Sequence, residues 1–281
     1  MNRKWLGAAA TTSLIVVSMI FQTEAQAAPQ TPQGGAQAGA PAGQRGRGGP
    51  GDPFAGQPRI KALIISGGCC HDYSGEAKVL MDSIGKVLPV DWTVAVQGGR
   101  GTTGTVSFYE RPDWIAGFDI VIHNECFADV SDPAYLRRIT SAHRGGTPAI
   151  VIHCAMHSYR AATVDDWREF LGVTSRRHTA AHNIAVKLAA PDEPPMQGAK
   201  RDWVTPVDEL YVIEKLWPNA KAIATAVSPE DHKEYPLVWT NLYNGTTRVF
   251  GTTLGHGEAT WDDPVFQDLL TRGFKWALKR D

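Results

Sequence analysis

Short, continuous apolar runs that alternate with helical segments constrain the fold of this sequence more than any other feature. The first run is Ile60–Ser66 (IKALIIS), and two glycines follow it. A run without the polar alternation of a half-exposed strand is typical of a strand buried on both faces of a sheet. Comparable strands are predicted at 92–96, 118–123 and 148–153.

Helical spacing between these strands predicts the layers that cover the sheet. Apolar residues recur on one side of segment 75–88, with Ser74 as the expected N-cap. A β-α-β-α order of this kind predicts parallel strands with helices on both faces. Further helices are predicted at 132–143, 167–171 and 264–278, and further strands at 184–188, 222–227, 237–242 and 248–254. We therefore expect an α/β fold, a flavodoxin-like three-layer sandwich with a mostly parallel central sheet and a strand-rich C-terminal half.

The N-terminal segment 1–27 resembles a signal peptide. Arg3 and Lys4 precede an apolar stretch, and the small-x-small pattern Ala25-Gln26-Ala27 follows it. Threonines and serines interrupt the stretch, whereas a stable membrane span needs about 20 strongly apolar residues. We expect export to the periplasm or the extracellular space and no stable membrane span.

Residues 28–58 are rich in Gly, Pro, Ala and Gln and offer little to bury, so they are predicted to be a disordered linker. The folded domain is predicted at 59–281, which is long enough for one α/β core. The chain carries 28 Lys and Arg against 29 Asp and Glu without a basic run, so nucleic acid is not an expected partner. Four cysteines are present, and the sequence leaves their pairing open.

Histidine occurs at the ends of four predicted strands. Because the carboxyl ends of parallel strands lie at one edge of a sheet, these ends predict a common site. The segments are Cys69-Cys70-His71-Asp72-Tyr73, His123-Asn124-Glu125-Cys126, His153-Cys154-Ala155-Met156-His157 and Gly255-His256-Gly257-Glu258.

Three chemistries could use such an edge. Imidazole with carboxylate or thiolate suits a divalent metal such as zinc, although no spaced ligand motif fixes the metal ligands. Cys154 could act as a nucleophile with His256 and Glu258, but the bulky Ile152 and Met156 do not fit a sharp nucleophile elbow. Histidines with a carboxylate could also perform general acid–base catalysis on a polar substrate.

Several segments together resemble the ThuA-like, or trehalose-utilisation, family, which has a class I glutamine amidotransferase-like fold. The similarity covers nearly all of 59–281. The segments are PAIVIHCAMHSYR (148–160), His182 before a strand, DELY (208–211), PLVWT (236–240) and RVFGTTLGHGEATWDDPVFQDLLTRGFKWAL (248–278).

The resemblance implies a role in carbohydrate metabolism, on keto-glycosides, with a small-molecule carbohydrate as the partner. A 3-keto group acidifies the neighbouring C2 proton, so histidines and one carboxylate suffice for elimination or isomerisation. A Cys154-dependent hydrolase or amidase and a non-catalytic sugar-binding module are the alternatives. The candidate catalytic residues are His153, His157, His256 and Glu209, and the candidate substrate-binding residues are His71, Tyr73, Asn124, His182, Tyr211 and Trp239.

Segment 205–211 has two interpretations. Thr205 and Pro206 are typical of a helix start, which would explain an acidic residue such as Asp208 near the positive helix end. Glu209 followed by Tyr211 is instead part of the resemblance. A loop that folds over the edge of the sheet would bring the Glu209 carboxylate to the histidines.

If the signal peptide is cleaved, the exported protein is expected to begin near Ala28. Intact-mass spectrometry of the protein recovered outside the cytoplasm checks this. A mass that still includes residues 1–27 would contradict the prediction.

Overall fold

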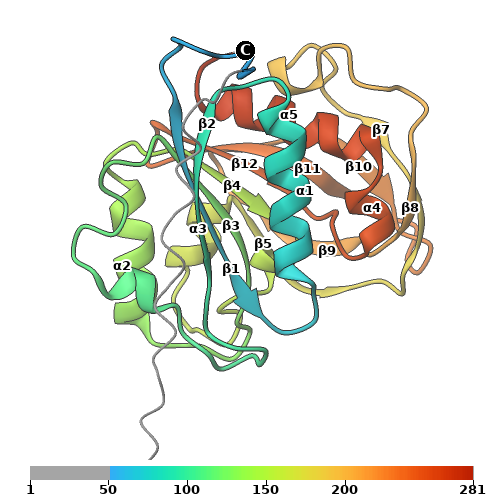
Figure 1. The fold of residues 1–281 in the computed structure, drawn as a ribbon. Coiled ribbons are helices and arrows are strands. Elements are labelled where there is room, and N and C mark those ends of the chain that lie inside the picture. Colours follow the sequence, from blue (N-terminus) through green and yellow to red (C-terminus); the bar gives the residue numbers. More distant parts are fainter. Residues whose placement is uncertain (1–50, 281) are drawn as a thin grey trace, which may run out of the picture. The chain divides into compact units, whose positions relative to one another are not determined.

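The computed structural model describes residues 51–280, and an eight-stranded sheet runs through their centre in the order β2-β1-β3-β4-β12-β11-β10-β7 (Figure 1). The strands β1 to β4 and β12 pair in parallel, and β11, β10 and β7 continue the sheet in antiparallel fashion. This arrangement confirms the expected α/β class with its mostly parallel sheet. The bounds are β1 Ile60–Gly68, β2 Val90–Val96, β3 Ile120–Cys126, β4 Ala149–Ile152, β7 Lys187–Leu188, β10 Ala220–Val227, β11 Glu234–Tyr243 and β12 Thr247–Thr252.

Helices cover both faces of this sheet. Helix α1 (Tyr73–Gly85) packs against α5 (Pro264–Ala277), and α2 (Pro133–His143) packs against α3 (Asp166–Leu171). The chain moves from β1 to β2 in one direction across the sheet and from β3 to β4 in the other. Because both crossovers are right-handed, α1 and α2 lie on opposite faces. The order therefore reverses between β1 and β3, and this switch point is where open α/β sheets bind ligands.

The expected N-cap of α1 was wrong by two residues. The side chain of Asp72, not of Ser74, accepts a hydrogen bond from the backbone N–H of Gly75 (3.2 Å). Helix α1 thus begins at Tyr73, directly after the turn that leaves β1. The tight turn brings residues 69–72 to the edge of the sheet.

The C-terminal half is strand-rich, as expected, and adds two small antiparallel sheets. One pairs β5 (Val173–His178) with β9 (Tyr211–Leu216), and the other pairs β6 (His182–Ala185) with β8 (Val204–Asp208). The short helix α4 (Glu258–Trp261) follows β12, and 3₁₀ turns occupy Ser107–Glu110, His153–Met156 and Pro194–Met196.

The helix start predicted around Thr205 is wrong, because these residues form strand β8. The Thr205 hydroxyl accepts a hydrogen bond from the Ile184 N–H (3.0 Å) and donates to the Pro206 carbonyl (2.7 Å). Pro206 is tolerated because it stands on a two-stranded sheet where the register with β6 shifts. Pairing with β6 therefore overrides the local helix signal.

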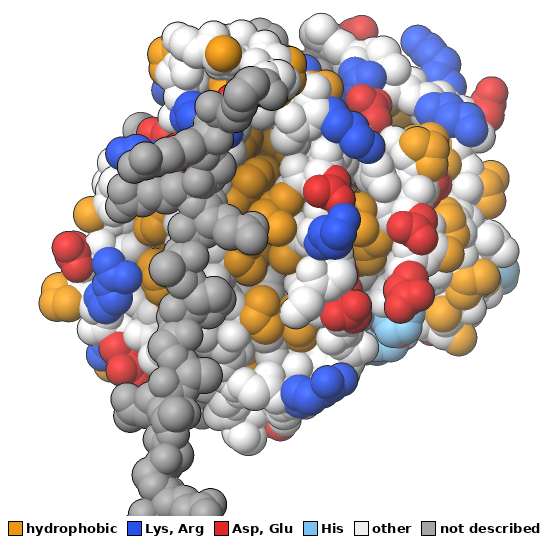
Figure 2. Space-filling model, viewed as in Figure 1, with side chains coloured by type: hydrophobic (Ala, Val, Ile, Leu, Met, Phe, Trp, Pro, Cys, Tyr) orange, Lys and Arg blue, Asp and Glu red, His pale blue; other side chains and the backbone are white. Residues whose placement is uncertain are grey.

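The signal-peptide prediction (1–27) and residues 28–50 of the predicted linker lie outside the described residues. Residues 51–58 form turns, in which the Asp52 carboxylate binds Arg59 at 3.1 Å. Within 51–280, no helix has both the length and the apolar composition needed to cross a membrane. On the face that Figure 2 shows, acidic and basic side chains of the described residues are interspersed rather than gathered by sign.

Trp239, a candidate for stacking on a sugar, lies in the core. Its side chain is fully buried on β11, and its indole N–H donates to the Leu171 carbonyl at 2.7 Å. The ring covers Gly251 of β12, its partner in register. Trp239 therefore exposes no ring face to a ligand, and its position corrects that expectation.

Gly251→Ala is expected to destabilise the domain by about 1–3 kcal/mol, the usual cost of overpacking a core. A Cβ at Gly251 would lie 2.2 Å from the Trp239 ring, which its hydrogen bond holds in place. Urea denaturation measures the change. Gly101→Ala is the control, because nothing lies within 4 Å of a Cβ there; equal effects of the two variants would contradict this account of Gly251.

Candidate functional site

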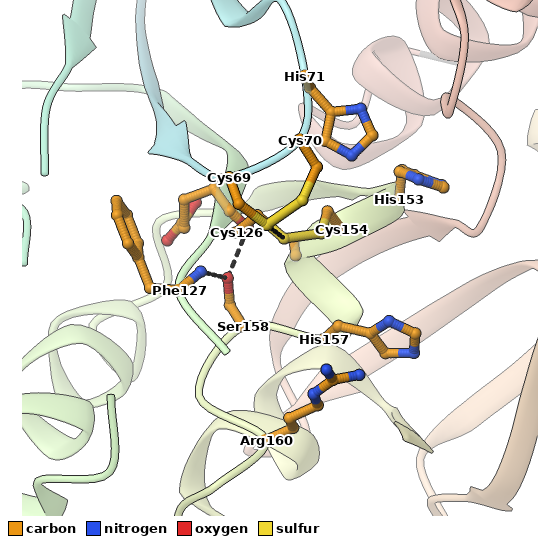
Figure 3. The surroundings of a disulfide bond; sticks show 12 residues. Cys69, Cys70, His71, Cys126, Phe127, His153, Cys154, His157, Ser158 and Arg160 are labelled. Atoms are coloured by element: carbon orange, nitrogen blue, oxygen red, sulfur yellow. Dashed lines mark hydrogen bonds between the residues drawn. A yellow bond between two sulfur atoms is a disulfide. The ribbon is translucent and has the colours of Figure 1, made fainter. Parts of the chain in front are cut away.

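Three imidazoles meet at the carboxyl ends of the parallel strands. His71 follows β1, His153 follows β4, and His256 follows β12. One nitrogen from each lies within 4.8 Å of those of the other two, and the ring centroids are 4.9–5.5 Å apart. Figure 3 shows His71 and His153 side by side next to the cysteines. Segments that are far apart in the sequence thus build one His71–His153–His256 cluster.

The hydrogen bonds of His153 leave its second nitrogen, Nε2, unprotonated, so that it can accept a hydrogen bond. Its Nδ1 lies 2.7 Å from the Thr253 carbonyl oxygen, which can only accept, so Nδ1 carries the proton. The lone pair of Nε2 then faces the Tyr211 hydroxyl (3.3 Å) and the Glu209 carboxylate (3.7 Å). Likewise, Nδ1 of His71 donates to the His256 carbonyl (3.2 Å).

Burial keeps two of these imidazoles neutral. It lowers the pKa of His71 to about 4, and the neighbouring His256 lowers it further, whereas the bond to the His256 carbonyl opposes the shift. Burial also holds the pKa of His153 well below its usual value, with His71 as the next cause. Neutral imidazole is the form that binds metals and accepts protons.

Glu209 reaches the cluster from the loop between β8 and β9. Its carboxylate lies 3.4 Å from Nδ1 of His256 and 3.4 Å from Nδ1 of the exposed His178. Burial raises the pKa of Glu209, and the charges of His256 and His178 oppose this. Nδ1 of His256 is buried and has no hydrogen-bond partner among the described residues.

This arrangement fits a cation. The Nε2 lone pair of His153 and the Glu209 carboxylate are both electron-rich, so a proton or a metal ion between them would stabilise the cluster. Three imidazoles and a carboxylate suit Zn²⁺ or a related divalent metal. The donor set of the described residues therefore fits the divalent metal that the sequence allowed.

Asp208 fixes the position of Glu209. The buried Asp208 carboxylate accepts hydrogen bonds from the backbone N–H groups of Glu209 (2.7 Å), Gly255 (3.0 Å) and His256 (3.2 Å). These bonds join the β8–β9 loop to the segment after β12. The role of Asp208 is thus a tertiary contact and not the helix-start charge that its sequence context suggested.

Glu76 is a site residue that the sequence analysis missed. It is buried in the first turn of α1, where its carboxylate lies 3.6 Å from Nδ1 of His71 and accepts a hydrogen bond from the Asn124 amide (2.7 Å). Burial raises its pKa to about 7, although the Asn124 bond lowers it. The sequence feature that could have identified Glu76 is an acidic residue on the apolar face of a predicted helix that follows a strand end.

A cavity of about 390 Å³ opens beside the cluster. Its walls come from Cys70–Asp72, from the first turns of α1 and from the segment 256–262, and they include His71, Glu76 and His256. The cavity is large enough for a small polar ligand.

Of the other predicted site residues, some contact the three-histidine cluster or Glu76 and others lie away from them. The Asn124 amide bonds Glu76, and the buried Tyr73 hydroxyl donates to the Cys69 carbonyl (2.7 Å). Tyr211 bonds His153 and stacks on His157 with the ring centroids 4.0 Å apart. His182 lies on β6 and bonds the Ala180 carbonyl (2.8 Å), so it is not part of the three-histidine cluster.

His123 does not join the other strand-end histidines. It is fully buried, with Nε2 3.0 Å from Nε2 of His143 and Nδ1 3.1 Å from Glu125. Trp167 and Phe170 of α3 also contact its ring. Because side chains alternate along a strand, His123 points to the α2–α3 face, while its neighbour Asn124 points to α1.

The cysteines are paired as Cys69–Cys70 and Cys126–Cys154. The Cys154 sulfur is therefore not a free nucleophile in this structure, and Nδ1 of His256 faces Glu209 instead. Glu258, the third member of the alternative Cys154 site, is exposed at the start of α4. These positions argue against the cysteine-hydrolase alternative.

Residues 61–277 match the family model ThuA, described as trehalose utilisation. The chain belongs to the ThuA family. A ThuA-like protein from Parabacteroides merdae shares 21% identity and superposes with a TM-score of 0.61, over 79% of this chain and 90% of that one. Another from Bacteroides uniformis shares 16% identity with a TM-score of 0.64, over 83% and 97%. These likenesses show the ThuA fold, and a search of curated proteins gives no match.

Each buried imidazole is expected to make the ThuA domain less stable in acid, whereas the raised pKa of Glu76 acts in the opposite direction. His157 is buried against Tyr211, and burial, with Arg160 as the next cause, lowers its pKa to about 3. Between about pH 6.5 and the folded pKa, the unfolded chain binds protons that the folded chain does not, so stability falls as the pH falls. From pH 7 to pH 5 each such imidazole is expected to contribute a loss of about 1–2 kcal/mol.

Urea denaturation at pH 7 and pH 5 measures this loss, and His157→Asn is expected to reduce it. His232→Asn is the matched control, because His232 is exposed in a left-handed conformation that asparagine tolerates. A loss unchanged by His157→Asn would contradict the prediction.

Proposed function

We propose that this ThuA-family chain is an exported enzyme of carbohydrate metabolism that acts on keto-glycosides by metal-assisted acid–base chemistry. The observation that carries the proposal is the convergence of three imidazoles and Glu209 next to an open cavity. The family's description as trehalose utilisation supports a sugar substrate.

His71, His153 and His256 would hold a divalent cation such as Zn²⁺. When bound, this ion would polarise a keto oxygen of the sugar as a Lewis acid. Nδ1 of His153 donates to the Thr253 carbonyl and that of His71 to the His256 carbonyl, and such bonds orient histidine ligands for a metal.

Glu209 is the proposed base. It is held by the backbone contacts of Asp208, and burial raises its pKa, which strengthens it as a proton acceptor. A carboxylate at this position can remove the acidic C2 proton of a 3-keto-glycoside.

Glu76 is the proposed acid. Its pKa of about 7 keeps a large fraction protonated at neutral pH, and it lines the cavity together with His71. A protonated carboxyl there can donate to the leaving glycosidic oxygen. The two carboxylates with separate environments thus match the two proton transfers of an elimination.

Glu209→Gln is expected to lower turnover of a 3-keto-glucoside by at least about 100-fold, because it removes the base and keeps the side-chain shape. Thermal stability is expected to change little. Glu214→Gln is the control, since Glu214 is exposed on β9 and pairs with Arg176. Turnover assays on zinc-loaded protein measure the effect, and full activity of Glu209→Gln would exclude Glu209 as the base.

Sugar binding without turnover by the unaltered protein would instead indicate a non-catalytic sugar-binding module.

A further inference from the structure

The four cysteines of the chain gather beneath the histidine cluster. Cys69 and Cys70 follow β1, Cys126 ends β3, and Cys154 lies just after β4, so the β1/β3 switch point brings three segments together (Figure 3). Two disulfides join them, Cys69–Cys70 and Cys126–Cys154. The Cys69 sulfur lies 3.6 Å from the Cys126 sulfur, so the two disulfides are in contact.

The two disulfides differ in their access to solvent. Cys70 is exposed and Cys69 is half-buried, whereas Cys126 and Cys154 expose only 3% and 6% of their surface. A dissolved thiol can therefore reach Cys70 but not the inner pair. Exposed disulfides are the ones that take part in exchange, while buried ones resist reduction.

We propose that the four cysteines form a disulfide relay that accepts electrons from an external dithiol at Cys70 and passes them to Cys154. In the first step, one thiolate of the dithiol attacks the Cys70 sulfur, and Cys69 leaves as a thiolate with the electron pair. The second thiolate of the dithiol then attacks its own sulfur in the mixed disulfide. Cys70 leaves as a thiolate, and the dithiol departs as a cyclic disulfide.

The second stage stays within the chain. The Cys69 thiolate attacks the Cys126 sulfur across the 3.6 Å contact, a Cys69–Cys126 bond forms, and Cys154 leaves as a thiolate. Two electrons have then moved from the dithiol to the protein. The two protons that the dithiol loses are taken up by Cys70 and Cys154. The product holds one disulfide and two thiols.

This relay is adjacent to the candidate active site. Cys70 directly precedes His71, and Cys154 directly follows His153. Both turns are conformationally restricted, because Cys70 and His153 have left-handed backbone angles (φ 87° and 44°) that non-glycine residues rarely adopt. Exchange of the disulfide partners thus acts on the backbone that holds two of the three imidazoles.

The test uses the oxidised full-length protein with one molar equivalent of dithiothreitol, followed by iodoacetamide and peptide mapping. The relay predicts alkylated Cys70 and Cys154 together with a peptide linked through Cys69 and Cys126. Alkylation of Cys69 and Cys70 with Cys126–Cys154 intact would overturn it. Isolation of the protein with four free thiols, with or without a bound metal, would also overturn it.

Two matched variants separate the stages. Cys69→Ser removes the internal nucleophile, so labelling of Cys154 is expected to fall at least about 10-fold under the same single equivalent. Cys70→Ser leaves Cys69 unpaired next to Cys126, and a free thiol at Cys154 is expected without any reductant. Equal labelling of Cys154 in Cys69→Ser and in the unaltered protein would reject the relay. If a variant does not fold, the peptide map of the unaltered protein decides alone.

Discussion

The buried carboxylate of Asp208 joins the β8–β9 loop to the segment after β12 at the candidate active site of this ThuA domain. It binds three backbone N–H groups, one from its own loop and two from the segment that follows β12. A buried carboxylate is stable only when such donors satisfy it, so the loop and the strand end must stay together. The Glu209 carboxylate and the His256 ring therefore hold their spacing, and the proposed chemistry depends on that spacing.

The parallel sheet supplies the other constraint. Because β1, β3, β4 and β12 run in one direction, residues that follow them share an edge, and His71, Cys126, His153 and His256 come from those positions. Two groups of reactive side chains lie at this edge of the sheet. His71, His256 and Glu76 line the cavity, and His153 and Glu209 contact this group from behind the lining. The paired cysteines lie at the β1/β3 switch point.

Burial links stability and function in this region. Desolvation keeps His71, His153 and His157 neutral and raises the pKa values of Glu76 and Glu209. Neutral His71 and His153 can bind a metal, and Glu76, with a pKa of about 7, can exchange a proton near neutral pH. The lowered pKa values of the buried imidazoles cost the fold stability in acid, whereas the raised pKa values of the two carboxyl groups act in the opposite direction. A site with these properties is expected to trade some stability for reactivity.

The sequence by itself determined the parallel α/β sheet, the helices that cover it and the family, because buried apolar runs and helical periodicity are local properties. It also placed histidines at the ends of four strands, three of which form the cluster. Only the tertiary structure decided which side of each strand a residue faces. His123 faces α2 and α3, and Trp239 is buried in the core. Glu76 lies on the apolar face of its helix, which marks it as unusual in the sequence, but only the packing of α1 shows that it contacts His71 and Asn124. The segment around Thr205 and Asp208 became a strand because pairing with β6 and bonds to the β12 end outweighed its helix-start residues.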